Sequence, residues 1–308
     1  NIHHGEREIV TRRVEGDIHR TNYSEIYSRA KKFSKALQKL GVRQGEVIGT
    51  LAWNTHRHLE SWYGITGIGA IYHTLNPRLF TEQLEYIINH AENQYIISDT
   101  TFIKLLEGIE KNIPNVKGFI FLTDKENMPD TKLKNSLSFE DIIDTEDEDF
   151  DWVRVDENDA CGLCYTSGTT GNPKGVLYSH RSNVLHTLAA NSADAMGISS
   201  VDSVLPVVPM FHANAWGISF SAPMVGCKVV MPGMNMDGES IYQLLTDEKV
   251  TFTAAVPTVW LMLLQYLEAN DLKLPYLNRV AIGGSAVPKM MLEKFEKDYE
   301  VSVMHAWG

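Results

Sequence analysis

A segment rich in glycines, hydroxyl side chains and one lysine is the strongest chemical signal in this chain. It reads YTSGTTGNPKG at positions 165–175 and follows an apolar run typical of a buried strand. Glycines let main-chain amides approach an anion closely, hydroxyls add hydrogen-bond donors, and a lysine adds a mobile positive charge. The combination predicts a loop that binds a polyphosphate. Its polar side chains are Thr166, Ser167, Thr169, Thr170 and Lys174.

A Walker A loop is the obvious alternative for a segment of this composition. That motif requires the lysine to follow a glycine and to precede Ser or Thr. Here Pro173 precedes Lys174 and Gly175 follows it, and the chain also lacks a GxGxxG fingerprint. The hydroxyl that would hold magnesium in a P-loop kinase or GTPase is therefore missing. The missing hydroxyl disfavours a phosphotransferase. Transfer of the γ-phosphate of ATP, in place of release of pyrophosphate, would support that alternative.

Three further stretches agree with the loop in order and spacing. They read PMFHANAWG at 209–217, GGSAVP at 283–288 and HAWG at 305–308. Together with 165–175, they resemble the signature motifs of the adenylate-forming superfamily, which includes acyl-CoA synthetases, luciferases and peptide-synthetase adenylation domains. The stretch around His212 is similar to that of fatty acyl-CoA synthetases in particular. The resemblance covers essentially the whole chain, so no single short motif carries it.

The resemblance implies a role for each matched position. The hydroxyl- and glycine-rich loop would hold the β- and γ-phosphates of ATP, and the turn at 283–288 would border the adenine and the bound acyl group. Trp307 would pack on the adenine, to which a flat apolar ring is suited. The implied nucleotide-binding residues are Thr166, Ser167, Gly168, Thr169, Thr170, Gly171, Lys174, Gly284, Ser285, Ala286, His305, Ala306, Trp307 and Gly308.

Two aromatic side chains of the 209–217 stretch are expected to meet the acid. His212 resembles the histidine that lies beside the acyl carbonyl and governs passage of the CoA arm, so it joins Lys174 as a candidate catalytic residue. Trp216 resembles the gate of the fatty-acid tunnel in long-chain members, and with His212 and Gly284 it would contact the substrate. A lone histidine is more often structural, and the matched residues that flank His212 favour the functional interpretation here. By composition alone, a buried core tryptophan is an equally good interpretation of Trp216.

The chemistry implied by the resemblance is AMP-forming ligation of a carboxylic acid to coenzyme A. The carboxylate attacks the α-phosphorus of ATP, pyrophosphate leaves, and the CoA thiolate then displaces AMP. Positioning and stabilisation of charge on phosphate oxygens carry such a reaction. Mg2+ is expected, because hard oxygen ligands select that ion. A short-chain or aryl acid, and a non-catalytic module that binds nucleotide or acyl adenylate, remain as alternatives to a fatty acid ligase.

The chain stops at Gly308, where the family motif continues with Thr and Glu. The resemblance implies that the magnesium-binding Glu, a ribose-binding Asp, the hinge and a small C-terminal domain with its adenylation lysine lie outside these residues. We therefore expect the isolated 308 residues to bind nucleotide weakly and not to catalyse adenylation. Robust ATP–pyrophosphate exchange by them would contradict this.

Alternating strand-like and helical segments must position these residues. Strands are expected at 47–52, 70–75, 95–98, 118–122, 160–165, 204–208, 228–231, 251–255, 279–282 and 302–305, and helices at 24–40, 56–67 and 81–90 among others. Such alternation implies parallel strands joined by crossover helices. The alternation predicts an α/β fold, and the resemblance implies that it is the large N-terminal domain of an acyl-CoA synthetase, with the C-terminal domain absent. Its lobes would span 1–159 and 160–308, the first ending in an acidic, solvated linker at 124–159.

Composition and charge limit which partners and which cellular location are expected for this chain. The net charge of −11, without a long basic block, excludes the electrostatic footprint of a nucleic-acid-binding protein. No apolar run is long enough for a membrane span, and the first residues contain no signal core, so cytoplasm is the expected location. The odd number of cysteines in apolar stretches (Cys161, Cys164 and Cys227) favours buried thiols over disulfides. Some relatives dimerise through this portion, so a homodimer is left open.

Overall fold

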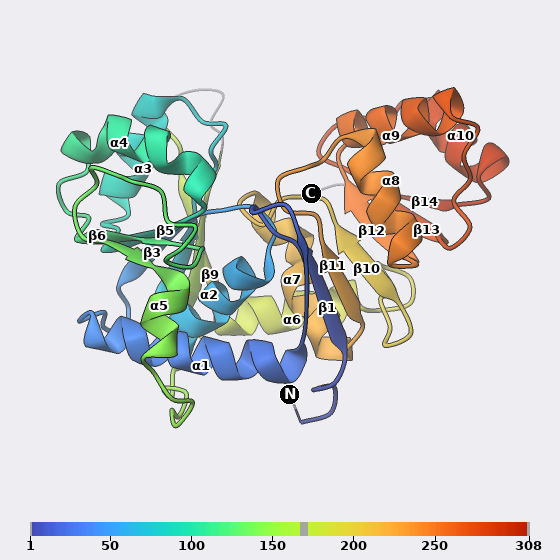
Figure 1. The fold of residues 1–308 in the computed structure, drawn as a ribbon. Helices are drawn as coiled ribbons and strands as arrows, with labels where there is room; N and C mark the ends of the chain where they lie inside the picture. Colours follow the sequence, from blue (N-terminus) through green and yellow to red (C-terminus); the bar gives the residue numbers. More distant parts are fainter. Residues whose placement is uncertain (1, 167–171, 307–308) are drawn as a thin grey trace. The chain divides into compact units, whose positions relative to one another are not determined.

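The computed structural model describes residues 2–166 and 172–306, which fold into two compact units. Unit 1 comprises Asn1–Tyr23, His186–Pro209 and Ala215–Gly308, and unit 2 comprises Ser24–Leu185 and Met210–Asn214. Each unit is built on one mainly parallel sheet flanked by helices (Figure 1). The predicted α/β class with parallel sheets is therefore confirmed.

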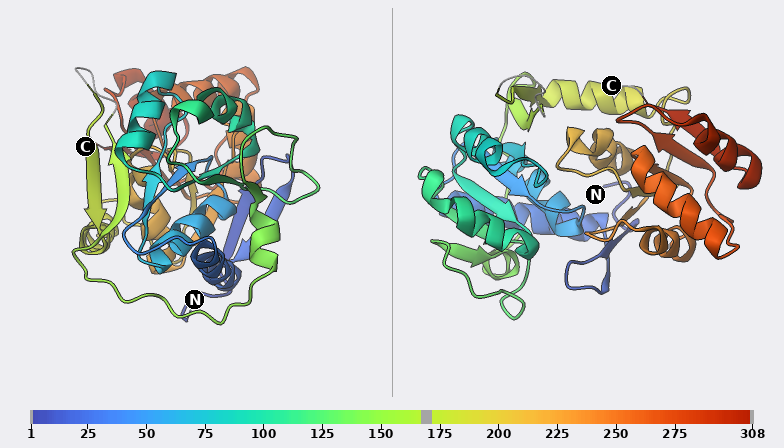
Figure 2. Two further views of the ribbon diagram at one scale, coloured as in Figure 1. Left: turned by 90° about the vertical axis from the view of Figure 1, so that its left-hand side faces the viewer. Right: turned by 90° about the horizontal axis from the view of Figure 1, so that it is seen from above.

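The sheet of unit 2 has the strand order β7-β6-β5-β3-β4-β8-β9, and its described strand pairs are parallel except for the antiparallel β8–β9 pair. Helices α3 and α4 lie on one face of it and α1 and α2 on the other (Figures 1 and 2). The elements are α1 Tyr23–Lys39, β3 Val47–Leu51, α2 His56–Gly67, β4 Ile71–Thr74, α3 Thr81–His90, β5 Tyr95–Ser98, α4 Ile103–Ile109, β6 Gly118–Phe121, β7 Ser136–Ser138, α5 Phe139–Asp144, β8 Ala160–Tyr165 and β9 Gly175–Ser179. Short 3-10 turns at Thr100–Phe102 and Glu110–Asn112 flank α4.

The sheet of unit 1 has the order β14-β13-β12-β10-β11-β1-β2, and among residues 2–166 and 172–306 its strand pairs are parallel except for the antiparallel β1–β2 pair. Helices α8, α9 and α10 bury an apolar cluster against this sheet, which includes Trp260 and Phe295. The elements are β1 Glu8–Arg12, β2 Ile18–Asn22, β10 Ser203–Pro206, a 3-10 turn Ala213–Gly217, α7 Ile218–Val225, β11 Lys228–Met231, α8 Gly238–Asp247, β12 Phe252–Ala255, α9 Pro257–Ala269, β13 Arg279–Ile282, α10 Lys289–Asp298 and β14 Ser302–His305. Helix α6, His180–Ala190, begins in unit 2 and ends in unit 1.

The division into units differs from the lobes 1–159 and 160–308 expected from the sequence. Strand β8 pairs in parallel with β4, with Tyr72 opposite Gly162, so residues 160–185 belong with the preceding lobe. Strand β1 pairs with β11, with Ile9 opposite Val229, so the first residues belong with the later lobe. Both pairings join segments far apart in the chain, and local sequence patterns carry no record of such partners.

The acidic stretch at 124–159 is not the plain solvated linker that its composition predicts. It contains β7 and α5, and Phe139 and Ile143 of α5 are buried. Glu140 of α5 accepts hydrogen bonds from Arg57 Nε at 2.6 Å and from Arg29 Nη2 at 3.0 Å, and Arg29 also pairs with the buried Glu60. These charged contacts fasten α5 to α1 and α2, so this part of the acidic stretch belongs to the folded unit.

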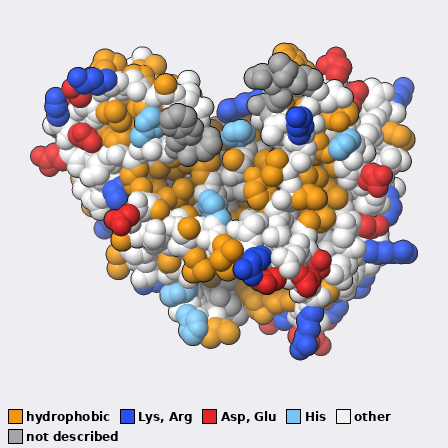
Figure 3. All heavy atoms as spheres, turned by 180° about the vertical axis from the view of Figure 1, so that it is seen from behind, with side chains coloured by type: hydrophobic (Ala, Val, Ile, Leu, Met, Phe, Trp, Pro, Cys, Tyr) orange, Lys and Arg blue, Asp and Glu red, His pale blue; other side chains and the backbone are white. Residues whose placement is uncertain are grey.

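Apolar side chains reach the surface along β9 and α6. Val176, Leu177, Val184, Leu185 and Leu188 each expose more than two fifths of their area. Figure 3 shows hydrophobic side chains gathered on the side opposite to the view of Figure 1.

No helix within the described ranges is both long and apolar enough to cross a bilayer. The thiols of Cys161, Cys164 and Cys227 are buried and free, as predicted.

Candidate functional site

The predicted phosphate loop connects the antiparallel strands β8 and β9. Thr166 N–H donates to the carbonyl of Lys174 at 2.9 Å, and Lys174 N–H donates to Thr166 Oγ1 at 3.2 Å. These hydrogen bonds close the base of the loop, and the Lys174 side chain is exposed. Ser167, Gly168, Thr169, Thr170 and Gly171 lie outside the described residues. The fold therefore places Thr166 and Lys174 together at the end of a sheet, where ligands of α/β proteins bind.

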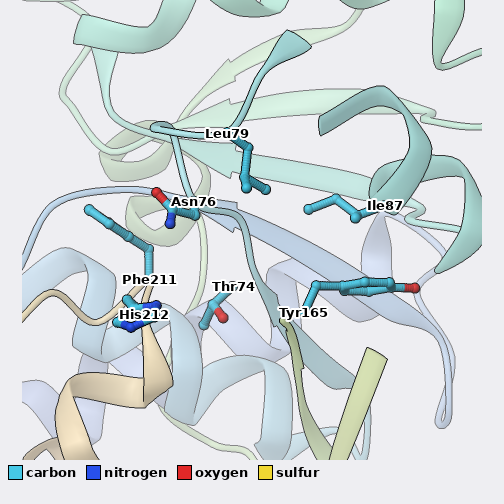
Figure 4. A pocket seen from close by; sticks show the side chains of 7 residues that line it. All are labelled: Thr74, Asn76, Leu79, Ile87, Tyr165, Phe211 and His212. Carbon is cyan, nitrogen blue, oxygen red and sulfur yellow. The ribbon is translucent and has the colours of Figure 1, made fainter. Parts of the chain in front are cut away.

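A small pocket lies at the carboxyl edge of the unit 2 sheet (Figure 4). It is lined by Thr74, Asn76, Leu79, Ile87, Tyr165, Phe211 and His212. Tyr165 directly precedes the predicted phosphate loop, and its hydroxyl lies 2.6 Å from His90 Nδ1. The rings of Tyr165 and the buried His73 pack at 5.1 Å between centroids. Tyr165 thus forms part of the pocket that His212 also lines.

His212 is placed by the residue before it. Phe211 is buried, contacts Trp53 with 5.9 Å between ring centroids, and has the guanidinium of Arg78 5.8 Å from its own ring centroid. His212 itself keeps solvent-exposed area, so it can meet a ligand. Partial burial, and next the positive charge of Arg78, lower the pKa of His212 below its ordinary value of 6.5. The imidazole is therefore neutral near pH 7, able both to accept and to donate one hydrogen bond.

Replacing Arg78 by Gln is expected to raise the pKa of His212 toward 6.5, because removing a nearby cation favours the imidazolium. The shift is partial, since burial persists. A histidine-selective NMR titration measures it, and Lys111→Gln, which removes a positive charge elsewhere in unit 2, is the matched control. An unchanged or lowered pKa in Arg78→Gln would contradict the electrostatic coupling.

The backbone directly after His212 forms a left-handed turn. Ala213, Asn214, Ala215 and Trp216 have φ values of 46°, 54°, 51° and 53°, and Gly217 follows at 77°. For non-glycine residues this conformation costs roughly 1–2 kcal/mol per residue, and such strain clusters at binding and catalytic sites. Ala215 N–H donates to the carbonyl of Pro209 at 3.2 Å and closes the loop that carries His212.

The predicted adenine turn and Trp216 meet in unit 1. Strands β13 and β14 run in parallel with Ile282 opposite His305, and Ala306 N–H donates to the carbonyl of Ile282 at 2.8 Å. A Cβ added to Gly283 would lie 2.8 Å from Ala306 O and 3.1 Å from Trp216 Cη2. Gly284 has a φ of 82°, a conformation that favours glycine. Residues 283–286 and 305–306 therefore share one carboxyl edge.

The residues predicted to bind nucleotide or acid thus fall into two groups, one in each unit. Thr166, Lys174 and His212 lie in unit 2, while Trp216, Gly284, Ser285, Ala286, His305 and Ala306 lie in unit 1. Ser285, Ala286 and His305 are exposed. Trp307 and Gly308 fall outside the described residues.

Sequence reasoning missed the pocket residues that follow β4. Asn76 stands before Pro77 directly after the apolar strand, and an Asn-Pro pair in that place marks a turn at the carboxyl end of a strand. That local signal could have identified Asn76. Arg78 carries no comparable signal, because only the tertiary structure places its guanidinium over the ring of Phe211.

Comparison with known proteins agrees with the motifs. The family described as AMP-binding enzyme matches residues 3–308. The chain is 45% identical to a medium-chain-fatty-acid–CoA ligase of Ectopseudomonas oleovorans over 99% of this chain and 56% of that protein. It is also 45% identical to a 3-methylmercaptopropionyl-CoA ligase of Ruegeria lacuscaerulensis over 99% of this chain and 57% of that protein. The chain therefore spans about half the length of these relatives.

A solved structure gives the same result for the fold. The anthranilate CoA ligase AuaEII, determined in complex with anthranoyl-AMP, superposes with a TM-score of 0.87 over 99% of this chain and 57% of that one. The identity is 22%, so the likeness establishes the fold alone. The predicted resemblance to the acyl-CoA synthetase fold is thereby confirmed.

Proposed function

Because the chain belongs to the AMP-binding enzyme family, we propose that the full-length protein is an AMP-forming ligase that joins a fatty acid to coenzyme A at the expense of ATP. The observation that carries the proposal is the 45% identity, over nearly the whole chain, to a medium-chain-fatty-acid–CoA ligase. The loop base at Thr166 and Lys174 and the neutral imidazole of His212 also support the proposal.

In the proposed reaction, Lys174 and the main chain of its loop hold the terminal phosphates of ATP. The α-phosphorus is then open to in-line attack by the carboxylate, and pyrophosphate leaves. The protein contributes position and the positive charge of Lys174, which stabilises oxygens that gain negative charge in the transition state. The turn at Gly284, Ser285 and Ala286, together with His305 and Ala306, takes the adenine and the start of the acyl group.

Two glycines of unit 1 support the proposed nucleotide site. Gly283 packs its bare Cα against Ala306, and Gly284 exposes main chain that a side chain would cover. Magnesium is different: within residues 2–166 and 172–306, no group of three His, Cys, Asp or Glu side chains could hold a metal ion. We therefore assign no step to Mg2+ on these residues, and Mg2+ stays a prediction from the resemblance.

For the second half-reaction, His212 is proposed to lie beside the acyl carbonyl. A neutral imidazole there can orient the carbonyl or the incoming thiol without adding a charge that would compete with Lys174. Trp216 is proposed to border the acid, because its ring lies against the Gly283 turn. The CoA thiolate attacks the acyl carbon and AMP leaves.

The identity of the acid is the variable part of this proposal. Two relatives of equal identity carry the names of different acids, a medium-chain fatty acid and 3-methylmercaptopropionate. The identity to the 3-methylmercaptopropionyl-CoA ligase favours a short-chain acid as the alternative substrate of the same reaction. A cytoplasmic location and a homodimer stay predictions.

A substrate panel on the full-length protein tests the proposal. We expect AMP, pyrophosphate and acyl-CoA in equal amounts, with the highest kcat/KM for medium-chain fatty acids. 3-Methylmercaptopropionate and aromatic acids form the comparison arms, and a higher kcat/KM for either would move the assignment to that acid. Release of ADP in place of AMP would overturn the ligase assignment itself.

A further inference from the structure

A buried side chain at the carboxyl end of β3 holds the main chain just before His212. Asn54 lies between β3 and α2, and its Oδ1 accepts the N–H of Met210 at 2.7 Å. Asn54 and Met210 are both fully buried. The contact spans 156 positions of the chain and lies two residues before His212. It is a direct link between the edge of the unit 2 sheet and the loop that carries the candidate catalytic histidine.

The hydrogen bond matters because it is buried. A buried main-chain N–H without an acceptor raises the free energy of the folded state. The fold is therefore more stable when Met210 lies where Asn54 accepts its N–H. An amide side chain also fixes direction, because its oxygen accepts along defined lone-pair directions. Met210 is thereby held at one position and one orientation.

The neighbours of Asn54 extend this fixed point to Phe211. Trp53 N–H donates to Asp99 Oδ2 at 2.6 Å, and Trp53 Nε1–H donates to Thr101 Oγ1 at 3.1 Å. The Trp53 ring packs on Phe102 and meets the edge of Phe211. Two consecutive residues, Trp53 and Asn54, therefore hold two consecutive residues, Met210 and Phe211.

We propose that Asn54 is a positioning residue that sets the placement of the His212 imidazole through its hydrogen bond to Met210. The inference rests on the proposed ligase function for its kinetic consequence, but its structural content concerns the placement of the ring alone. A left-handed turn begins at Ala213, directly after His212. Strained backbone of this kind persists only where its surroundings hold it, and the hydrogen bond of Asn54 to Met210 holds the chain on the side before His212.

The first experiment measures the thioester-forming step in the full-length protein. Asn54→Leu removes the acceptor at similar volume, and we expect CoA-dependent turnover of preformed acyl adenylate to fall about 10-fold, since small misplacements of a reacting group cost up to about 10²-fold. Asn54→Asp keeps an oxygen acceptor and is expected to recover part of the loss. Ser34→Ala is the control, because Ser34 is also buried and donates to a main-chain carbonyl, that of Gly64, within unit 2.

A double-mutant cycle separates positioning from general damage. If Asn54 acts through His212, Asn54→Leu changes the rate by less than about twofold once His212 is already alanine. Independent effects that multiply in the double variant would overturn the proposal, as would a loss in Ser34→Ala equal to that in Asn54→Leu. Where Asn54→Leu does not fold, Asn54→Ser, which is too short to reach Met210, replaces it.

The second experiment reads the imidazole without requiring activity. In the full-length protein labelled with 13C-histidine, the His212 resonance is the one that His212→Ala removes. In Asn54→Leu we expect its pKa to rise toward the ordinary value, because the freed ring is better solvated and farther from Arg78. An unchanged titration overturns the inference. Absence of acyl-CoA formation in the wild-type protein would instead refute the ligase proposal and leave this result readable.

Discussion

Lys174→Ala in the full-length protein is expected to lower ATP–pyrophosphate exchange by roughly 10²- to 10³-fold, the usual effect of removing one side chain that stabilises negative charge in a transition state. Lys174 is the cation of the loop, and its main chain is already fixed by both hydrogen bonds to Thr166. The alanine variant keeps those main-chain bonds, so the fold of the hairpin is retained and the loss falls on ATP. The rate of exchange at saturating acid, measured as a function of ATP, gives the result.

Lys125→Ala is the matched control for this variant. Lys125 is an exposed lysine of the same unit and takes no part in the proposed site. We expect its exchange rate to equal that of the wild type. An unchanged dependence on ATP in Lys174→Ala would contradict the assignment of the loop to the phosphates.

Gly283→Ala is expected to weaken nucleotide binding by about 10- to 100-fold. The added methyl would lie 2.8 Å from the main-chain oxygen of Ala306, and that oxygen belongs to backbone that cannot rotate away. Overpacking of this kind costs about 1–3 kcal/mol. The strain falls where the hydrogen bond from Ala306 to Ile282 joins the ends of β13 and β14, so the proposed adenine turn must shift. Calorimetric titration of the full-length protein with ATP measures the affinity.

Gly108→Ala controls for the generic effect of adding a methyl group to a glycine. Gly108 lies in helix α4, and a Cβ there would meet no atom within 4 Å. It is expected to leave nucleotide affinity unchanged and to stabilise the protein by about 0.5–1 kcal/mol, because alanine is the better helix former. Equal nucleotide affinity in Gly283→Ala and in the wild type would show that the turn at Gly283 does not border the base.

The local elements of the fold were readable from the sequence. Helices at 56–67 and 81–90 and strands at 95–98, 160–165, 228–231, 279–282 and 302–305 have the observed bounds. Their apolar periodicity is a property of neighbouring residues, which is why a single sequence contains it. Strands β1, β2, β7 and β9 were missed. In β9, the apolar residues Val176 and Leu177 are exposed, and among the described residues this strand pairs with β8 alone.

The candidate site likewise contains residues that the sequence identified and residues that it did not. The phosphate loop, the stretch around His212 and the glycine turn at 283–284 are short and contiguous, so residue type and spacing were enough to identify them. Asn54 and Arg78 were invisible, since a single Asn after a strand and a single Arg after a proline have many ordinary explanations. Their roles depend on contacts with Met210 and Phe211, more than a hundred positions away.

The order of the amino acids alone was enough to predict the α/β class, the family resemblance and the residues that are candidates for binding ATP and acid. Three features became visible in the folded chain: β1 and β2 complete the sheet of β10–β14, Glu140 fastens α5, and Asn54 accepts a hydrogen bond from Met210 in the His212 loop. The physical reason is the range of the interactions. Secondary structure and anion-binding loops arise from groups adjacent in the chain, whereas strand partners, buried ion pairs and the anchors of a loop form only when distant segments meet.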